Sequence, residues 1–600
     1  MSEPAAPPPT GHNPDLLAAI PLSARCVLEI GCGHGALGLA YRARNPRVRY
    51  LGVDVDAAQA AIAATRLNEV AVADIEANPF PFGRDLRPDC IVYGDVLEHL
   101  RDPFALLARH LEILAPDGII ALSVPNLEHW SIAARLLAGT WDYEEEGLLD
   151  RTHLRWFTRT NLEAGLRRLG LAIHRCEPRI FDAPAADHFT ETIAPALNAL
   201  GVDASAYRER AQALQYVVRA GREARAPMIL AASMLDPIGG VSHVRILYPM
   251  AALGSDPATR VQVYANGDAI DPPDPETPHI FILHRASMLG REGRTMLRSL
   301  LAQGWVIVTD FDDHPDYFEA MRRPGQLGFL GVHAVQTTTP ALAEILARRN
   351  PEVAVFANAV PSLRGVHNFA APDRLTLFFG ALNREEDWRP LLGALNAAAK
   401  IAGARLHFRI VHDQALFDAL ETPHKDFTPV CDHETYLTLL GGCEISLMPL
   451  ADTPFNRAKS DLKFLEASAC RVMSLASRMV YGGSIADGRT GLLFDSAEAL
   501  RERLLRLVAM PELARQIADA ARAHVATSRM LAYQVPERLA WYRALWERRG
   551  ALTALLMERL AAHAERDLPE DDPADMPAAG RSAPEYPPPI PRETAPFGSG

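Results

Sequence analysis

The sequence lacks an excess of positive charge, a long apolar run and paired cysteines, and each absence excludes a class of protein. Its 61 lysines and arginines are outnumbered by 74 aspartates and glutamates, which gives a net charge of −13, whereas nucleic-acid binders concentrate basic residues on one face. No apolar run reaches a length of about 20 residues, which a helix needs to cross a membrane. The seven cysteines include no CxxC pair, and no histidine cluster has ligand spacing, which argues against disulfides and structural zinc. We therefore expect no nucleic-acid partner, no transmembrane segment and no metal.

The composition is that of ordinary soluble globular protein. Aromatic residues make up only 7%, hydrophobic residues 48% and charged residues 22% of the 600 residues, a length that suffices for about three to five domains. The first nine residues, MSEPAAPPP, lack the basic segment and apolar core of a secretion signal. The Pro-rich ends, 1–14 and 567–600, have too little apolar surface to offset their ordering entropy. We expect a cytoplasmic protein with disordered ends.

Short apolar runs alternate with helical patterns, which is typical of parallel sheets with crossover helices. A first block has strand candidates at 25–30, 49–54, 70–73, 89–93 and 118–124. A second block has candidates at 228–234, 261–265, 279–284, 305–310, 332–337 and 353–357, and resumes after a break with 375–380, 405–411, 427–431, 444–448 and 471–475. The pattern predicts an α/β protein with three sheets.

The first block carries a glycine-rich turn between a strand and a helix. The strand CVLEI (26–30) enters the turn GCGHG (31–35), where glycines let a ligand approach the backbone and the helix start offers free N–H groups. The next strand ends at Asp54, an acid suited to ribose hydroxyls. Both NAD and S-adenosylmethionine carry such a ribose, so these residues alone leave an oxidoreductase and a methyltransferase open.

Together with the segment DVLEHL (95–100), these motifs resemble class I S-adenosylmethionine-dependent methyltransferases over about 20–180. The resemblance implies a Rossmann-like fold that binds S-adenosylmethionine as cofactor. It also implies that the three glycines cradle the methionine part, that Glu29 reaches its amino group through water, and that the acids after the strands bind the ribose, the adenine and the methionine end. These cofactor-binding residues are Glu29, Gly31, Gly33, Gly35, Asp54, Asp74 and Asp95.

A hydroxyl acceptor would need a base to remove its proton, and histidine titrates near the working pH. The segment DRTHLRWFT (150–158) resembles one that lies beside the acceptor pocket in the same family, so we expect His153 to be that catalytic base. His99 is the rival candidate, although within its motif it is expected to pack or to orient a helix.

The second block offers another glycine turn, at Gly239 and Gly240, after the strand at 228–234. Further along, Arg384 follows a strand, and Lys459 and Lys463 precede and begin a helix that also carries Glu466. Cations near a helix start suit a diphosphate, and a carboxylate suits a ribose. The alternative is that Lys463 and Glu466 form an ordinary solvated pair one turn apart.

This order resembles glycosyltransferases of the GT-B fold over about 226–550, in which two Rossmann-like halves face each other. The resemblance implies a nucleotide-sugar donor as co-substrate, with the two glycines facing its phosphate, the basic residues neutralising its diphosphate and Glu466 holding its ribose. These sugar-nucleotide-binding residues are Gly239, Gly240, Arg384, Lys459, Lys463 and Glu466. Ala458 departs from the pattern, because many retaining members carry a glutamate eight positions before the second acid. Asp461 is the nearest substitute.

The segment VTDFDDH (308–314) ends a strand with several ionisable groups. A divalent metal clamp is one interpretation, since paired aspartates bind Mg²⁺ or Mn²⁺, but members of the GT-B group usually need no metal. We instead expect Asp312 and His314 to be catalytic groups at the acceptor, with a solvated turn as the remaining alternative. His284 is expected to be a buried histidine at a strand end.

The expected domains are a methyltransferase at 15–182, a helical connector at 183–226, a GT-B N-terminal half at 227–365, and a donor-binding half with terminal helices at 366–566. The sequence predicts an enzyme that methylates and glycosylates a glycan or a lipid-linked glycan in polysaccharide biosynthesis. Such an acceptor would bring the protein to the inner face of the cytoplasmic membrane as a peripheral protein. The alternative is a methyltransferase whose second block only binds glycans or acts as a scaffold.

Overall fold

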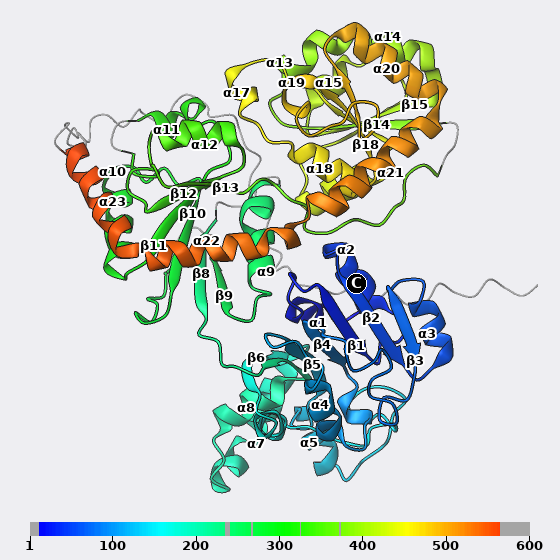
Figure 1. Ribbon diagram of the computed structural model, residues 1–600, viewed down its shortest axis with the longest axis vertical. Coiled ribbons are helices and arrows are strands. Elements are labelled where there is room, and N and C mark those ends of the chain that lie inside the picture. Colours follow the sequence, from blue (N-terminus) through cyan, green and yellow to red (C-terminus); the bar gives the residue numbers. More distant parts are fainter. Residues whose placement is uncertain (1–10, 235–239, 266–267, 324–325, 371–373, 565–600) are drawn as a thin grey trace, which may run out of the picture.

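The computed structural model describes residues 11–234, 240–265, 268–323, 326–370 and 374–564. Its strands form three sheets, each in a separate α/β unit (Figure 1). The predicted α/β class, with one Rossmann-like unit followed by two more, is confirmed. Residues 11–14 do not fit the expected disordered end, since Asn13 caps the first helix, and the tail 567–600 lies outside the described residues.

The first sheet has seven strands in the order β3-β2-β1-β4-β5-β7-β6. Five are parallel, and β7 runs antiparallel between β5 and β6. The strands are β1 (Cys26–Ile30), β2 (Arg49–Asp54), β3 (Glu69–Val72), β4 (Cys90–Gly94), β5 (Ile119–Pro125), β6 (Ala172–Arg179) and β7 (Gln215–Gly221). The helices are α1 (Pro14–Ala19), α2 (Ala36–Arg44), α3 (Ala57–Ala63), α4 (Pro103–Leu111), α5 (Trp130–Leu137), α6 (Arg159–Arg168), α7 (Ala183–Ala199) and α8 (Ala204–Gln212).

The stretch 183–226 differs from the connector that the sequence predicts. It contains two helices, α7 and α8, but then returns to the first sheet as β7, where Tyr216, Val218 and Ala220 are buried in the core of that unit. Alternate residues of a strand lie on the same face, and these three pack into the core of the first unit. The stretch that contains β7 therefore belongs to the first unit.

The second sheet has six parallel strands in the order β13-β12-β11-β10-β8-β9. They are β8 (Met228–Ser233), β9 (Thr259–Tyr264), β10 (His279–His284), β11 (Val306–Asp310), β12 (Ala334–Thr337) and β13 (Val353–Val355). The helices of this half are α9 (Tyr248–Leu253), α10 (Gly290–Ala302), α11 (Glu319–Arg322) and α12 (Pro340–Ala347). Every residue of β10 and β11 is buried, as expected for a parallel sheet covered on both faces.

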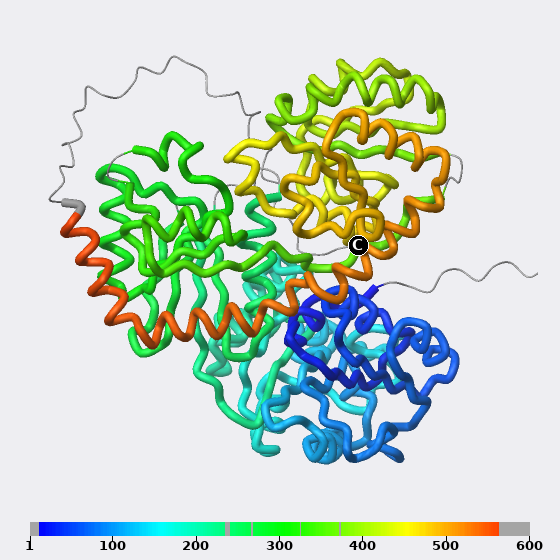
Figure 2. Tube along the Cα trace, turned by 45° about the horizontal axis from the view of Figure 1, so that its top comes forward, coloured from blue at the N-terminus to red at the C-terminus, as the bar shows by residue number. Residues whose placement is uncertain are grey.

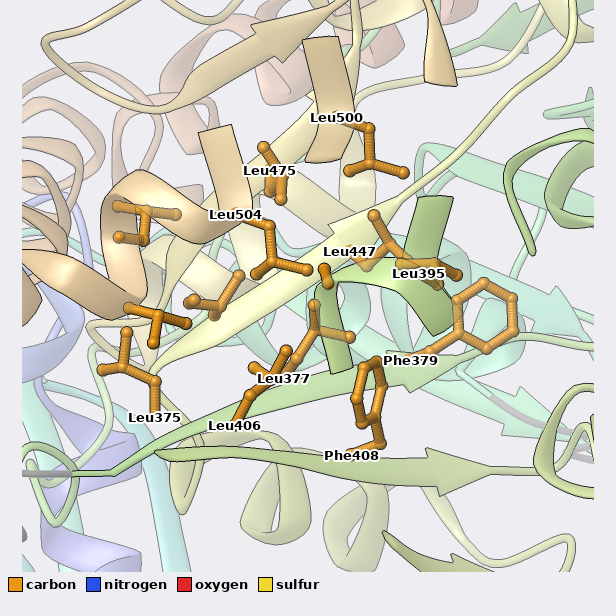
Figure 3. Packing of buried hydrophobic residues seen from close by; sticks show 14 of the residues in the cluster. Leu375, Leu377, Phe379, Leu395, Leu406, Phe408, Leu447, Leu475, Leu500 and Leu504 are labelled. Atoms are coloured by element: carbon orange, nitrogen blue, oxygen red, sulfur yellow. The ribbon is translucent and has the colours of Figure 1, made fainter. Parts of the chain in front are cut away.

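The third sheet has six parallel strands in the order β16-β15-β14-β17-β18-β19. They are β14 (Leu375–Gly380), β15 (Leu406–Val411), β16 (Lys425–Thr428), β17 (Ile445–Met448), β18 (Met473–Ser477) and β19 (Leu492–Phe494). The helices are α13 (Glu385–Trp388), α14 (Leu392–Ala402), α15 (Gln414–Ala419), α16 (His433–Gly441), α17 (Pro454–Arg457), α18 (Leu462–Ala469), α19 (Arg478–Tyr481), α20 (Ala497–Ala509) and α21 (Pro511–Ser528). Leucines and phenylalanines of β14, α14 and α20 form its largest core (Figure 3).

The last two helices, α22 (Val535–Glu547) and α23 (Arg549–Ala564), cross back to the second sheet (Figures 1 and 2). Leu539, Tyr542 and Leu545 are buried with the strands of that sheet. The prediction that the terminal helices belong to the donor-binding half is therefore wrong for these two, because their apolar faces cover the N-terminal half. The chain crosses between the second and third units twice, and a β-bridge between Val360 and Met530 joins the two crossing segments.

The first unit contacts the N-terminal half of the second block and the first crossing between its two halves. The Leu22 N–H donates to Ser255 Oγ (2.9 Å), and the buried Arg219 of β7 donates to the Ser255 carbonyl (2.8 Å). The carbonyl of Ala43, in α2, accepts from the Leu363 N–H (2.8 Å) on the first crossing. Among the described residues, no helix combines the length and the apolarity needed to span a bilayer.

Candidate functional site

The loop after β1 is held against the end of β2. The Gly33 N–H donates to one oxygen of Asp54 (2.7 Å), and the Asp56 N–H donates to the other (2.9 Å). Gly33 has a φ of +51° and Gly35, which begins α2, has a φ of +78°. Because L-residues rarely adopt this backbone, the glycines allow the turn that points the N-terminus of α2 at this sheet edge.

Gly31 links this loop to the segment that follows β4. A Cβ at Gly31 would lie 2.5 Å from a methyl group of Val96, and its φ is +69°. Only glycine therefore fits. The two motifs that the sequence placed 65 residues apart are in direct contact at the carboxyl edge of the sheet, where open α/β sheets bind ligands.

Acidic side chains surround this edge. Glu29 is buried, burial raises its pKa to about 8, and its Oε2 has no hydrogen-bond partner among the described residues. Asp95 accepts from the Gln215 amide (3.0 Å), and burial raises its pKa too. Asp74 is exposed two residues beyond β3. The structure thus places every predicted cofactor-binding residue of the first unit along one edge.

His153 lies on a loop that is fixed to the same edge. The N–H groups of Leu154 and Arg155 both donate to the Glu98 carbonyl (2.7 and 2.9 Å). The His153 ring is buried, its centroid is 4.9 Å from that of His99, and its Nδ1 is 3.3 Å from the Leu148 carbonyl. Burial first, and His99 second, lower the pKa of His153. The two rival histidines are therefore neighbours.

A cavity of about 300 Å³ lies between the second and third sheets. It brings together residues of two predicted groups: Gly240, Arg384, Lys459, Lys463 and Glu466, which the sequence predicted for the sugar nucleotide, and Asp312, which it predicted for the acceptor. Arg285, Asp313, His412, His433, Tyr436 and Tyr481 also line it, and the sequence analysis missed them. For Arg285 a signal existed, because it directly follows the strand end at His284, which is buried as expected.

Two of the cations in this cavity are partly neutralised. The Lys459 Nζ lies 2.7 Å from Asp313 Oδ2 in the opposite half. Burial lowers the pKa of Lys459, while the Asp313 carboxylate opposes that shift. Arg384 donates to Asp387 (3.1 Å) and to Asn456 (3.0 Å).

Lys463 and Glu466 lie one turn apart on α18, within the third unit. Lys463 donates to the Gly380 carbonyl and, at 3.3 Å, to the Tyr436 hydroxyl. Among the described residues no carboxylate oxygen lies within 4.0 Å of its Nζ. Burial lowers the pKa of Lys463 to about 8 and raises that of Glu466 to about 7. The pair is desolvated rather than a solvated helix face, and it faces the cavity.

Asp312 and His314 differ in their position relative to the cavity. Asp312 lines the cavity and is ion-paired with Arg285 (2.6 Å). Burial would raise the pKa of Asp312, but the Arg285 charge lowers it to about 2, so this carboxylate is a weak base. His314 is not among the lining residues, and its Nδ1 accepts from the Asp316 N–H (3.3 Å) at the start of a short 3₁₀ turn.

The predicted glycine turn is described in part. Gly239 lies outside the described residues. Gly240 lines the cavity, and a Cβ on it would lie 2.5 Å from the His433 ring. Only glycine leaves room for His433, whose Nε2 lies 3.8 Å from Glu466 Oε1.

The absence of an acidic residue at position 458 also has a structural reason. Ala458 is buried in an apolar cluster of the N-terminal half, where an unpaired carboxylate would be costly. Asp461 does not replace it, because both of its oxygens bind Arg529 (2.7 and 3.0 Å). The carboxylates that remain at the cavity are Glu466, Asp312 and Asp313.

Comparison with known proteins agrees with this two-part architecture. Residues 9–175 match the family described as "Methyltransferase domain", and residues 384–535 match the family described as "Glycosyl transferase-like". The chain therefore contains a methyltransferase domain followed by a glycosyltransferase-like domain, as the sequence motifs predicted.

Individual relatives cover parts of the chain. The trans-aconitate 2-methyltransferase of Methylobacterium radiotolerans is 35% identical over 132 residues, which are 21% of this chain and 50% of that protein. The ubiquinone biosynthesis O-methyltransferase of Cereibacter sphaeroides is 30% identical over 140 residues, 21% of this chain and 52% of that protein. The chain thus spans about half the length of these relatives. A crystal structure of Anabaena HepE in complex with UDP-glucose is 14% identical, with a TM-score of 0.37, and covers 52% of this chain and 99% of that chain.

Proposed function

We propose that this chain transfers a methyl group from S-adenosylmethionine and a sugar from a nucleotide sugar to a glycan acceptor. The observation that carries the proposal is the convergence of Arg384, Lys463 and Glu466 on one cavity between two facing α/β halves, beside a separate methyltransferase unit. The two sites would act on successive steps or on neighbouring hydroxyls of one glycan.

The residues at the edge of the first sheet fit S-adenosylmethionine. Glu29 has a buried oxygen without a partner among the described residues, which suits the cofactor's ammonium group reached through water. The Gly31–Gly35 loop admits a ligand against its backbone, Asp54 would hold the ribose, Asp74 the adenine amino group, and Asp95 would line the methionine end. The cofactor, when bound, supplies an electrophilic methyl group on a sulfonium.

His153 would accept the proton of the acceptor hydroxyl. Its Nδ1 faces the Leu148 carbonyl and therefore carries hydrogen, which leaves the lone pair on Nε2. Its lowered pKa keeps the ring neutral near pH 7. His153→Ala is expected to lower methyl transfer at saturating cofactor while S-adenosylmethionine affinity stays unchanged.

In the donor cavity, Lys463 and Arg384 would neutralise the diphosphate and Glu466 would bind the ribose, as charge-assisted hydrogen bonds are strong away from water. Asp312 and His314 remain candidates for the acceptor side. Since Asp312 is held ionised by Arg285, its role there would be to orient a sugar hydroxyl by accepting a hydrogen bond.

The acceptor would be a glycan or a lipid-linked glycan of polysaccharide biosynthesis, met in the cytoplasm at the inner face of the membrane. Large exposed apolar side chains on and after α5 support contact with a lipid tail. They are Leu136, Leu137, Trp141 and Tyr143.

A second candidate function is supported by Ala458. With no acid at this position, the glycosyltransferase-like block could bind a glycan without transferring sugar, and only the first unit would be catalytic. Release of free sugar or transfer to an acceptor from a nucleotide sugar separates the two functions.

The proposal is tested by mass spectrometry of glycans from producing cells with and without the gene. Joint loss of a methyl group and a sugar is expected for the bifunctional enzyme. Loss of the methyl group alone would favour the binding module, and glycans with no change would contradict both.

A further inference from the structure

Glu98, His99 and His153 bring three metal-ligand types together at the edge of the first sheet. One ligand atom of each lies within 4.8 Å of the others. Ligand atoms lie about 2.0–2.2 Å from a bound ion. Shifts of the three side chains towards one another by a few tenths of an ångström to about 1 Å would bring all three ligand atoms to that distance from a shared ion. Glu98 and His99 lie on a 3₁₀ turn, Leu97–His99, and His153 on the loop bonded to that turn through the Glu98 carbonyl.

The hydrogen bonds around both rings prepare a nitrogen lone pair for a cation. Thr152 Oγ1 donates to Asp150 (2.6 Å) and therefore accepts from His99 Nδ1 (3.0 Å). His153 Nδ1 faces the Leu148 carbonyl (3.3 Å). In each histidine Nδ1 carries hydrogen and Nε2 carries the lone pair. Metal-bound histidines show the same pattern, in which the other nitrogen donates to an oxygen.

Glu98 is the independent sign that a cation is missing. Its side chain is 1% exposed, and its Oε2 has no hydrogen-bond partner among the described residues. A buried carboxyl oxygen without a partner is costly. A cation bound here would satisfy that oxygen.

We propose that Glu98, His99 and His153 bind one divalent transition-metal cation, with Zn²⁺, Mn²⁺, Fe²⁺ and Co²⁺ as the class that two imidazoles and a carboxylate favour. The site stands on its own geometry. Its role rests on the proposed function: an open position on the cation would bind the acceptor hydroxyl oxygen and ease loss of its proton to solvent, as the new oxygen–methyl bond forms and the sulfonium–methyl bond breaks. His153 is then a ligand in the metal-bound protein and a base only without metal.

Zn²⁺ binding to the intact, untagged, chelator-treated chain tests the site, by calorimetry, with Co²⁺ absorption as a second readout of coordination. We expect one ion per chain, bound at micromolar concentration or tighter, with tetrahedral or five-coordinate Co²⁺ bands. His99→Ala and Glu98→Gln should each weaken binding at least tenfold, whereas His188→Ala, which removes an exposed histidine of α7, should leave it unchanged.

S-adenosylmethionine affinity, measured on the same samples, shows which variants are folded and separates this inference from the proposed function. Equal Zn²⁺ binding by all variants would mean that surface histidines hold the ion, and it would overturn the site. Absence of binding to the unsubstituted chain would overturn it as well. Failure to bind S-adenosylmethionine with Zn²⁺ binding intact would refute the methyltransferase proposal and leave the metal site standing.

Discussion

Lys459 and Asp313 join the two halves of the donor cavity, with 2.7 Å between the Lys459 Nζ and Asp313 Oδ2. This pairing sets Lys459 apart from Lys463, which has only neutral oxygens as hydrogen-bond partners. A diphosphate would gain more from the amine that has no carboxylate partner. The structure thus ranks two lysines that the sequence left equivalent.

Lys463→Ala is expected to weaken the affinity for UDP-glucose or another nucleoside diphosphate sugar by about 10- to 100-fold, since a hydrogen bond to a charged group contributes about 1.5–3 kcal/mol. Lys459→Ala should have a smaller effect on this affinity, because the positive charge of Lys459 is already paired with the Asp313 carboxylate. Calorimetry measures both, with Lys400→Ala on the exposed end of α14 as the control. The ranking fails if Lys459→Ala is the more damaging variant.

Donor affinity should depend on pH through Glu466 and Lys463. The pKa of Glu466 is raised to about 7, so lowering the pH below 7 protonates it and removes a charged acceptor for the ribose. The pKa of Lys463 is lowered to about 8, so raising the pH above 8 removes its positive charge. Affinity for a nucleotide sugar, whose diphosphate stays ionised throughout, is expected to be highest between pH 7 and 8.

Glu466→Gln is the matched test of the acid side of this profile. The variant keeps the shape of the side chain and should show weaker binding at pH 7.5 with no further loss down to pH 6. A decline below pH 7 that is as steep as in the unsubstituted protein would assign the titration to another group.

Asp54→Ala should lower S-adenosylmethionine affinity by about 10- to 100-fold, through loss of a charge-assisted partner for the ribose worth about 1.5–3 kcal/mol. Asp56→Ala is the control, because Asp56 caps α3 and does not reach the Gly31–Gly35 loop. Thermal unfolding identifies any loss of structure. Unchanged affinity in a folded Asp54→Ala protein would remove Asp54 from the cofactor site.

The contact between the first unit and the second block depends on Arg219. This side chain is 5% exposed and donates to the carbonyls of Gly254 and Ser255. Arg219→Met should leave these acceptors unpaired, at a cost of about 1–3 kcal/mol. We expect faster proteolysis within residues 222–226, of which all but Arg225 are exposed. Arg175→Met, which removes an exposed ion pair on β6, is the control and should be cleaved at the original rate.

The sequence was sufficient to predict most of the parallel strands, though not β19, and to single out part of the donor cavity, including Arg384, Lys463 and Glu466. Strands such as β1, β10 and β14 are buried over nearly their whole length, and such runs are visible without a structure. The glycine turn and Asp54 were found because their chemistry follows directly after strands.

Other features depended on tertiary contacts. In β6 the burial pattern is irregular because it is an edge strand, so its sequence, AIHRCEPR, resembles a loop. The return of α22 to the second sheet and the Lys459–Asp313 pair join residues that are far apart in sequence. The ion pair of Asp312 with Arg285 could not be read from spacing either, and it changes the role open to that aspartate.

Calorimetric titration of the intact chain with S-adenosylmethionine, and then with a nucleotide sugar in its presence, is the most direct test of the central claim. We expect one site for each ligand, with neither ligand displacing the other. Asp54→Ala should weaken binding of the first ligand alone, and Lys463→Ala should weaken binding of the second alone. Binding of NAD in place of S-adenosylmethionine, or competition of both ligands for one site, would contradict the account.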